Sequence, residues 1–99
     1  MPKIITQEDT DTLLREPPLY KVLLHNDNYT TMDFVVMVLS KIFHKNQEAA
    51  EKIMIQVHKS GKGLCGIYTK EIAETKVEHV KILAKQNSFP LLATFEIDE

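Results

Sequence analysis

Residues 19–43, LYKVLLHNDNYTTMDFVVMVLSKIF, hold the clearest structural pattern of the sequence. The β-branched and aromatic run over residues 19–25 predicts a first strand. The triplet Asn26-Asp27-Asn28 then predicts a turn, because Asn and Asp side chains bond their own backbone. Apolar residues recur at positions 34, 35, 38, 39, 42 and 43, which is helical spacing, and Thr30 or Thr31 can cap this helix.

The remaining sequence adds two helices and two strands. Asn46 can cap a second helix, which Gly61 and Gly63 end. A second strand is expected over residues 64–69, with a bulge or close approach at Gly66. A third helix is expected over residues 72–86 and a last strand over residues 91–97. We therefore predict an α+β fold in the order β-α-α-β-α-β, with a three-stranded antiparallel sheet packed against three helices.

Residues 1–18 differ in character from the rest of the chain. They carry scattered charges and little periodicity, and they end at Pro17-Pro18. Chain termini of this kind are commonly poorly ordered. The sequence predicts a mobile N-terminal extension over residues 1–18 and one core domain over residues 19–99.

Composition excludes several classes of protein. The 99 residues suffice for one domain, and the 43% hydrophobic and 26% charged residues are typical of globular chains. A net charge of -2 argues against a nucleic-acid partner, and the longest apolar runs fall short of the roughly 18 residues of a membrane span. The single cysteine and the acids near the N-terminus favour a reducing cytoplasm without a membrane partner.

Catalytic and metal-binding motifs find little support. The sequence contains no G-x-S-x-G, no Gly-rich phosphate loop and no H-E-x-x-H. A metal cluster of His25, His58 and Asp27 and a nucleophilic pair of Cys65 and His58 remain as alternatives. Against them, the histidines have no metal-ligand spacing, and a mid-strand cysteine is typically a small core residue. We expect no enzyme activity, no cofactor and no metal.

A polar turn next to an apolar surface is the remaining candidate site. Residues one helical turn apart share a face of the helix. If the first two helices pack as a hairpin, one group of such residues on each helix would border the same small pocket. These groups are Met54, Val57 and His58 on the second helix and Met32 and Val35 on the first. The turn at residues 26–28 would supply hydrogen-bond acceptors at its rim. The alternative keeps Met54 and Val57 in the core and makes His58 a helix cap.

Five stretches of the sequence resemble the ClpS adaptor family, in order and at matching spacing, over about residues 18–96. They are YKVLLHNDNYTTMDFV (20–35), MIQVH (54–58), GKGLCG (61–66), EIAETKV (71–77) and PLL (90–92). The resemblance implies an N-degron adaptor of the N-end rule. Such adaptors bind proteins that begin with Leu, Phe, Tyr or Trp and deliver them to a ClpA-type AAA+ unfoldase for proteolysis by ClpP.

The resemblance also implies roles for individual residues. Positions matching the α-amino contact are Asn26, Asp27 and His58. Positions matching the side-chain pocket are Thr30, Met32, Val35, Met54, Val57 and Leu91, with Met32 as a gate against β-branched residues. Positions matching the docking surface for the unfoldase N-domain are Glu71, Glu74 and Lys76. The extension matches the segment that the family uses for delivery, and we expect a bacterial, monomeric protein.

Two residues depart from the family pattern. Asn28 stands where a second acid is common, and Thr31 stands where a proline is common. A second class of function also remains open, a protein-interaction module without N-terminal recognition, similar to the C-terminal domain of the ribosomal stalk protein. A small cysteine- or metal-dependent hydrolase is a third. The Asn26, Asp27 and His58 constellation favours the adaptor.

Overall fold

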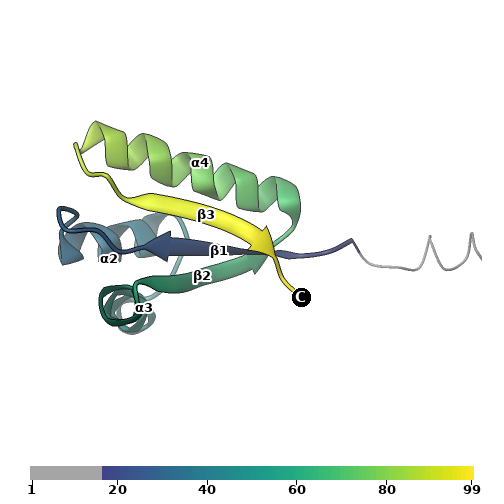
Figure 1. The fold of residues 1–99 in the computed structure, drawn as a ribbon, viewed down its shortest axis with the longest axis horizontal. Coiled ribbons are helices and arrows are strands. Elements are labelled where there is room, and N and C mark those ends of the chain that lie inside the picture. The colour runs from purple at the N-terminus through teal and green to yellow at the C-terminus, as the bar shows by residue number, and fades with distance from the viewer. Residues whose placement is uncertain (1–16) are drawn as a thin grey trace, which may run out of the picture.

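The computed structural model describes residues 17–99. The predicted mobile extension lies outside this range, apart from Pro17 and Pro18. The described residues form six elements, seen in Figure 1: β1 (Tyr20–His25), α2 (Met32–Lys41), α3 (Gln47–Ser60), β2 (Lys62–Tyr68), α4 (Lys70–Gln86) and β3 (Leu92–Ile97). The predicted α+β class and the order β-α-α-β-α-β are confirmed. Within the described range, none of the helices has the length and apolar character that a membrane crossing requires.

Strand β1 lies in the middle of the sheet. The strand order is β2-β1-β3, and both pairings are antiparallel, as predicted. The register against β2 shifts between Val22 and Leu23, where Cys65 has no partner and Gly66 pairs with Val22. The irregularity thus falls at Cys65, one position before Gly66, where the sequence predicts a bulge or close approach. Because β1 pairs on both sides, its two ends are fixed by the whole sheet.

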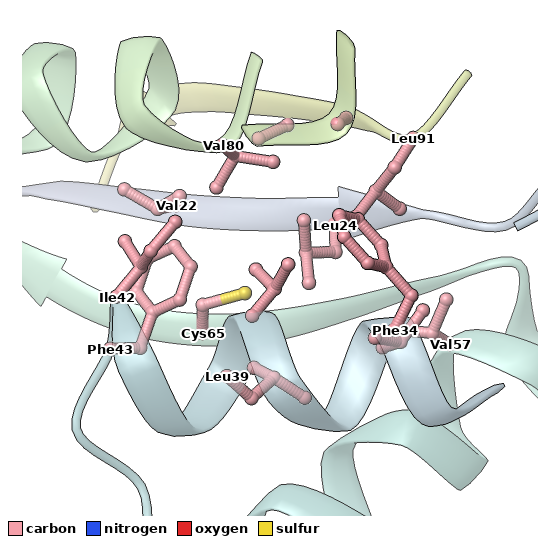
Figure 2. Packing of buried hydrophobic residues seen from close by; sticks show 14 of the residues in the cluster. Val22, Leu24, Phe34, Leu39, Ile42, Phe43, Val57, Cys65, Val80 and Leu91 are labelled. Carbon is pink, nitrogen blue, oxygen red and sulfur yellow. The ribbon is translucent and has the colours of Figure 1, made fainter. Parts of the chain in front are cut away.

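One hydrophobic core joins the sheet to all three helices. Val22 and Leu24 are fully buried on β1. Figure 2 shows them beside Cys65 of β2, Leu39 of α2 and Val80 of α4. Burying each such aliphatic side chain contributes roughly 1.5–3 kcal/mol. The opposite face of the sheet carries polar contacts, including a hydrogen bond of 2.7 Å between His25 and Thr94.

Side-chain caps set the helix boundaries around the candidate site. Of the two threonines predicted to cap the first helix, Thr31 does so, because its Oγ1 accepts from Phe34 N at 3.1 Å. Asn46 caps α3 as predicted, and its Oδ1 accepts from Ala49 N at 2.8 Å. Gly61 ends α3 with φ of 90°, a left-handed conformation that glycine adopts without steric cost.

Two predicted starts of elements are wrong, because each element begins two residues earlier than expected. The strand expected over residues 64–69 begins at Lys62, because the reversal at Gly61 lets residues 62 and 63 pair with β1 at once. Gly63 therefore belongs to the strand rather than to the end of the helix. The helix expected from residue 72 begins at Lys70, because Thr69 serves as its N-cap.

Gly63 is where β2 passes closest to α3, and it provides the first prediction. A Cβ atom at this position would lie 2.7 Å from Val57 Cγ2 and 3.2 Å from the carbonyl oxygen of Ile53. Gly63→Ala should therefore push α3 away from the sheet and lower the free energy of unfolding by about 1–3 kcal/mol. Urea denaturation measures the change, with Lys62→Ala as the exposed neighbouring control. Equal midpoints for Gly63→Ala and wild type would contradict the close approach.

Candidate functional site

The loop between β1 and α2 is held by the carboxylate of Asp27. Its Oδ1 accepts hydrogen bonds from the backbone N–H groups of Tyr29 at 2.8 Å and Thr30 at 2.7 Å. Its Oδ2 accepts from Thr30 Oγ1 at 2.7 Å. In turns, an Asp or Asn side chain commonly accepts the hydrogen bonds of backbone N–H groups that have no backbone carbonyl as a partner. Because both oxygens bind the loop itself, Asp27 fixes the positions of its neighbours Asn26 and Asn28.

The ionisation of Asp27 reflects two opposed effects. Partial burial disfavours the charged form and by itself would raise the pKa of the carboxyl group. The hydrogen bonds from Thr30 and Tyr29 favour the charged form, and together they prevail, so the pKa lies below its ordinary value. Asp27 is therefore negatively charged at neutral pH.

A backbone hydrogen bond joins the end of β1 to the end of α3. The N–H group of Asn26 donates to the carbonyl oxygen of Gly61 at 2.9 Å. His58 lies in the last turn of α3, and its side chain is exposed. The C-terminal end of a helix carries a partial negative charge that stabilises cations nearby. A positively charged group beside His58 would therefore meet both this helix end and the charge of Asp27.

A cavity of about 250 Å³ opens between this loop and the two helices. Its polar lining residues are Asn26, Asp27, Asn28, Thr30 and His58, and its apolar ones are Met32, Val35, Met54 and Val57. Its volume lies below the roughly 300–1,000 Å³ of pockets for drug-sized ligands. The cavity therefore suits one amino-acid side chain with a small polar group at its rim.

The apolar residues of the cavity differ in exposure. Val35 and Val57 are 6% and 2% exposed and belong to the hydrophobic core, so they form a fixed wall. Met32 is 48% exposed at the first position of α2. Methionine side chains are unbranched and flexible, so Met32 can adapt to a group that lies beside it. The two alternatives for Val57 are thus both realised, since it is a core residue that also lines the cavity.

Eight of the predicted amine and side-chain residues line this cavity, and one does not. Leu91 is 6% exposed and lies in the hydrophobic core, near the end of β1 in Figure 2, but is not part of the lining. Its role in the pocket stays a prediction. Asn28 also lines the cavity, although no individual contact is predicted for it beyond the acceptors expected from the turn at residues 26–28. Its place in the same short turn as Asn26 is the signal that could have found it.

Cys65 and the histidines do not form the alternative nucleophilic or metal sites. Cys65 is fully buried, and desolvation raises the pKa of its thiol to about 12, which removes the reactive thiolate at neutral pH. Among residues 17–99, no group of three His, Cys, Asp or Glu side chains is placed to hold a metal ion.

A second hollow, of about 290 Å³, lies between Ile42 and α4, and its polar lining consists of His79 and Gln86.

The residues predicted for docking lie on α4 and differ in their surroundings. Glu71 and Glu74 are exposed. Lys76 is partly buried, and its Nζ donates to the carbonyl oxygen of Ile42 at 2.6 Å. The same ammonium group lies 5.5 Å from the ring centroid of Tyr68 and 5.9 Å from that of Phe43. Lys76 therefore ties α4 to the end of α2, in addition to any role at the surface.

Comparison with known proteins agrees with this architecture. The sequence model of one protein family, described as ATP-dependent Clp protease adaptor protein ClpS, matches residues 15–94 of this chain. The chain belongs to the ClpS family. The ClpS adapter of Myxococcus xanthus is 49% identical over 96 residues, which are 97% of this chain and 90% of that protein. The ClpS adapter of Lawsonia intracellularis is 52% identical over 99 residues, covering 99% of this chain and 87% of that protein.

A solved ClpS structure has the same fold. Agrobacterium tumefaciens ClpS2 bound to L-phenylalaninamide superposes with a TM-score of 0.81 at 36% sequence identity, covering 84% of this chain and all of that one. The present protein is thus an adaptor of the Clp protease by family, and its relatives are named as adaptors rather than as enzymes.

The hydrogen bonds of Asp27 lead to a prediction about stability and pH. Asp27→Ala should lower the free energy of unfolding by about 1 kcal/mol at neutral pH, as the loss of a helix cap does. Because the folded-state pKa is lowered, this contribution is present above the unfolded pKa of about 3.9 and is lost as the pH falls through the folded value. The difference from wild type should therefore shrink below about pH 4.

Urea denaturation at neutral and acidic pH measures this difference. Asp98→Ala, which removes an exposed carboxylate near the C-terminus, is the matched control. A difference that grows toward acidic pH would contradict the assignment.

Proposed function

We propose that this ClpS protein binds proteins through a free N-terminal residue with a bulky hydrophobic side chain and delivers them to a ClpA-type unfoldase for degradation by ClpP. One observation carries the proposal: a single cavity combines polar acceptors with an apolar wall at the size of one side chain. L-Phenylalaninamide, the ligand of the Agrobacterium relative, supports it. That molecule has a free α-amino group, a benzyl side chain and an amide in place of a carboxylate, so it is chemically an N-terminal phenylalanine residue.

The polar rim would bind the α-amino group. An N-terminal amine has an ordinary pKa of about 7.7–8.0, so it is mostly a cation with three N–H donors at neutral pH. The amide oxygen of Asn26 and an unprotonated nitrogen of His58 can accept from it. Asp27 holds the loop in place and adds its negative charge, and the end of α3 adds a favourable dipole. Asn28 supplies a further amide oxygen without the charge of an acid.

The apolar wall would bind the side chain. Burial of Leu, Phe, Tyr or Trp between the two helices contributes roughly 1.5–3 kcal/mol when complete. Met32 stands at the start of α2, where it can close on an unbranched Cβ. A second substituent on Cβ, as in Ile or Val, would meet this side chain, so β-branched residues should bind weakly.

An acetylated N-terminus should be refused. It lacks the charge and presents one N–H donor, so acceptors that the bound ligand covers from water lose their partners at a cost of about 1–3 kcal/mol per group. The alternative of an interaction module without N-terminal recognition predicts no such discrimination. The comparison between free and acetylated peptides therefore separates the two functions.

Fluorescence anisotropy with three matched labelled peptides tests the proposal. The peptides begin with free Phe, with N-acetylated Phe and with free Ile, and are otherwise identical. The free Phe peptide should bind, and the other two should bind at least about tenfold more weakly. His58→Ala should weaken binding of the free Phe peptide, whereas Lys59→Ala, at the exposed position next to it, should not. Equal binding of the acetylated peptide would refute N-terminal recognition.

The surface proposed for docking, on α4, would lie away from the cavity. Glu71 lines a hollow together with Pro17, Pro18 and Tyr20, where β1 begins, whereas the cavity adjoins Asn26, where β1 ends. At about 3.4 Å per residue, these ends lie roughly 17 Å apart. A substrate and an unfoldase N-domain could therefore occupy the protein together. The base of the predicted extension would then lie beside the unfoldase, which suits its proposed part in delivery.

Substitutions on α4 test this separation. The double variant Glu71→Ala, Glu74→Ala should weaken binding to an immobilised ClpA N-domain and leave affinity for the free Phe peptide unchanged. Glu48→Ala removes an exposed acid from α3 and serves as the control. Unchanged binding of the double variant to the N-domain would exclude this surface.

Lys76 requires a separate variant, because it also ties α4 to α2. Lys76→Met should lower the free energy of unfolding by about 1 kcal/mol without any partner present. A loss of docking in this variant counts for a direct contact only where it exceeds what the lowered stability explains.

We further propose that the protein acts as a monomer, since one chain supplies the whole cavity. We place it in the bacterial cytoplasm, as its proposed partners imply. A nucleic-acid partner is not expected, because the net charge of -2 gives no attraction for a phosphate backbone.

A further inference from the structure

Tyr29 is an exposed aromatic residue in the loop that borders the cavity, and the proposed function leaves it without a role. Its side chain is 77% exposed, more than any other large hydrophobic side chain in the described part of the chain. Its two neighbours, Asn28 and Thr30, both line the cavity, whereas Tyr29 itself does not.

The backbone at Tyr29 is held in place. Its N–H group donates to Asp27 Oδ1 at 2.8 Å, and the next residue, Thr30, makes two further bonds to the same carboxylate. A tyrosine on such a fixed loop loses little conformational freedom when it binds, because its side chain has two χ angles. Aromatic residues of this kind commonly act as anchors at binding surfaces.

The size of the cavity determines what passes near Tyr29. About 250 Å³ holds one side chain, so a bound protein must leave the cavity after its first residue. Consecutive Cα atoms are about 3.8 Å apart, which places the second residue directly at the rim. The loop carrying Tyr29 supplies four of the nine residues that line the cavity, so it forms a large part of this rim.

We propose that Tyr29 is a specificity-determining residue that contacts the side chain of the second residue of the substrate. The proposal rests on the proposed function and extends it from the first residue to the second. An apolar second side chain packs on the tyrosine ring, whereas glycine has nothing to place there. Burying part of an apolar side chain against the ring corresponds to about three- to tenfold in affinity. Substrates with a bulky apolar second residue should therefore bind more tightly than those with glycine.

Competition against a labelled Phe peptide tests this inference on the full chain. The competitors are L-phenylalaninamide, which ends after one residue, and two peptides that begin Phe-Leu and Phe-Gly and are otherwise identical. Wild type should prefer Phe-Leu to Phe-Gly by about three- to tenfold. Tyr29→Ala should remove this preference and leave the affinity for L-phenylalaninamide unchanged. Tyr29→Phe should retain the preference, and Ile72→Ala, which removes an exposed side chain from α4, should behave as wild type.

The outcomes separate the inference from the proposed function. If wild type fails to bind L-phenylalaninamide, the proposed function is refuted, and the inference with it. If it binds but Tyr29→Ala keeps the preference for Phe-Leu, the inference alone is refuted. A Tyr29→Ala variant that loses affinity for L-phenylalaninamide and both peptides to the same degree would also refute it, because Tyr29 would then act by ordering the loop.

Discussion

The candidate site depends on one backbone hydrogen bond, from Asn26 N–H to the carbonyl oxygen of Gly61. This bond closes the end of β1 onto the end of α3, two segments that are far apart in the sequence. It requires the chain to reverse immediately after α3, and the positive φ of Gly61 provides that reversal. Together with the pairing of His25 and Lys62, the bond places Asn26 next to the last turn of α3, which carries His58. The close contact of Gly63 with α3 serves the same purpose, since it holds Val57 against the sheet.

The residues of the loop between β1 and α2 have different roles in the candidate site. Charge and shape come from Asp27, whose two oxygens are used by the loop itself, while its neighbours Asn26 and Asn28 line the cavity with amide side chains. The departure of Asn28 from the acid common in the family thus leaves the organisation of the loop intact, because that organisation rests on Asp27. The departure at Thr31 has a local compensation, since its hydroxyl group caps α2. Neither departure therefore removes a hydrogen bond that shapes the site.

Local patterns in the sequence were enough to predict the elements and their order. The caps at Thr31 and Asn46, the stop at Gly61 and the irregularity next to Gly66 all act within a few residues of themselves, and each leaves a recognisable pattern. Contacts between distant segments leave none. Lys76 donates a hydrogen bond to the carbonyl oxygen of Ile42, 34 positions away, and no local sequence pattern around either residue predicts this bond. The same limit applies to Leu91, whose apolar character fits a pocket and a core equally well. It lies in the core, and its part in the pocket stays a prediction.

The expected strength of the proposed interaction depends on the size of the cavity. One buried side chain contributes roughly 1.5–3 kcal/mol, and each hydrogen bond between charged and polar groups roughly as much. Association must offset a loss of translational and rotational freedom of at least about 4 kcal/mol. The sum leaves a weak to moderate, rapidly reversible interaction. That strength suits an adaptor, because a substrate that is to be passed to an unfoldase must also leave the adaptor, and a deeper cavity would hold it there. In the proposed function, the small volume of the site would limit recognition to one residue and leave any further selectivity to residues around the cavity.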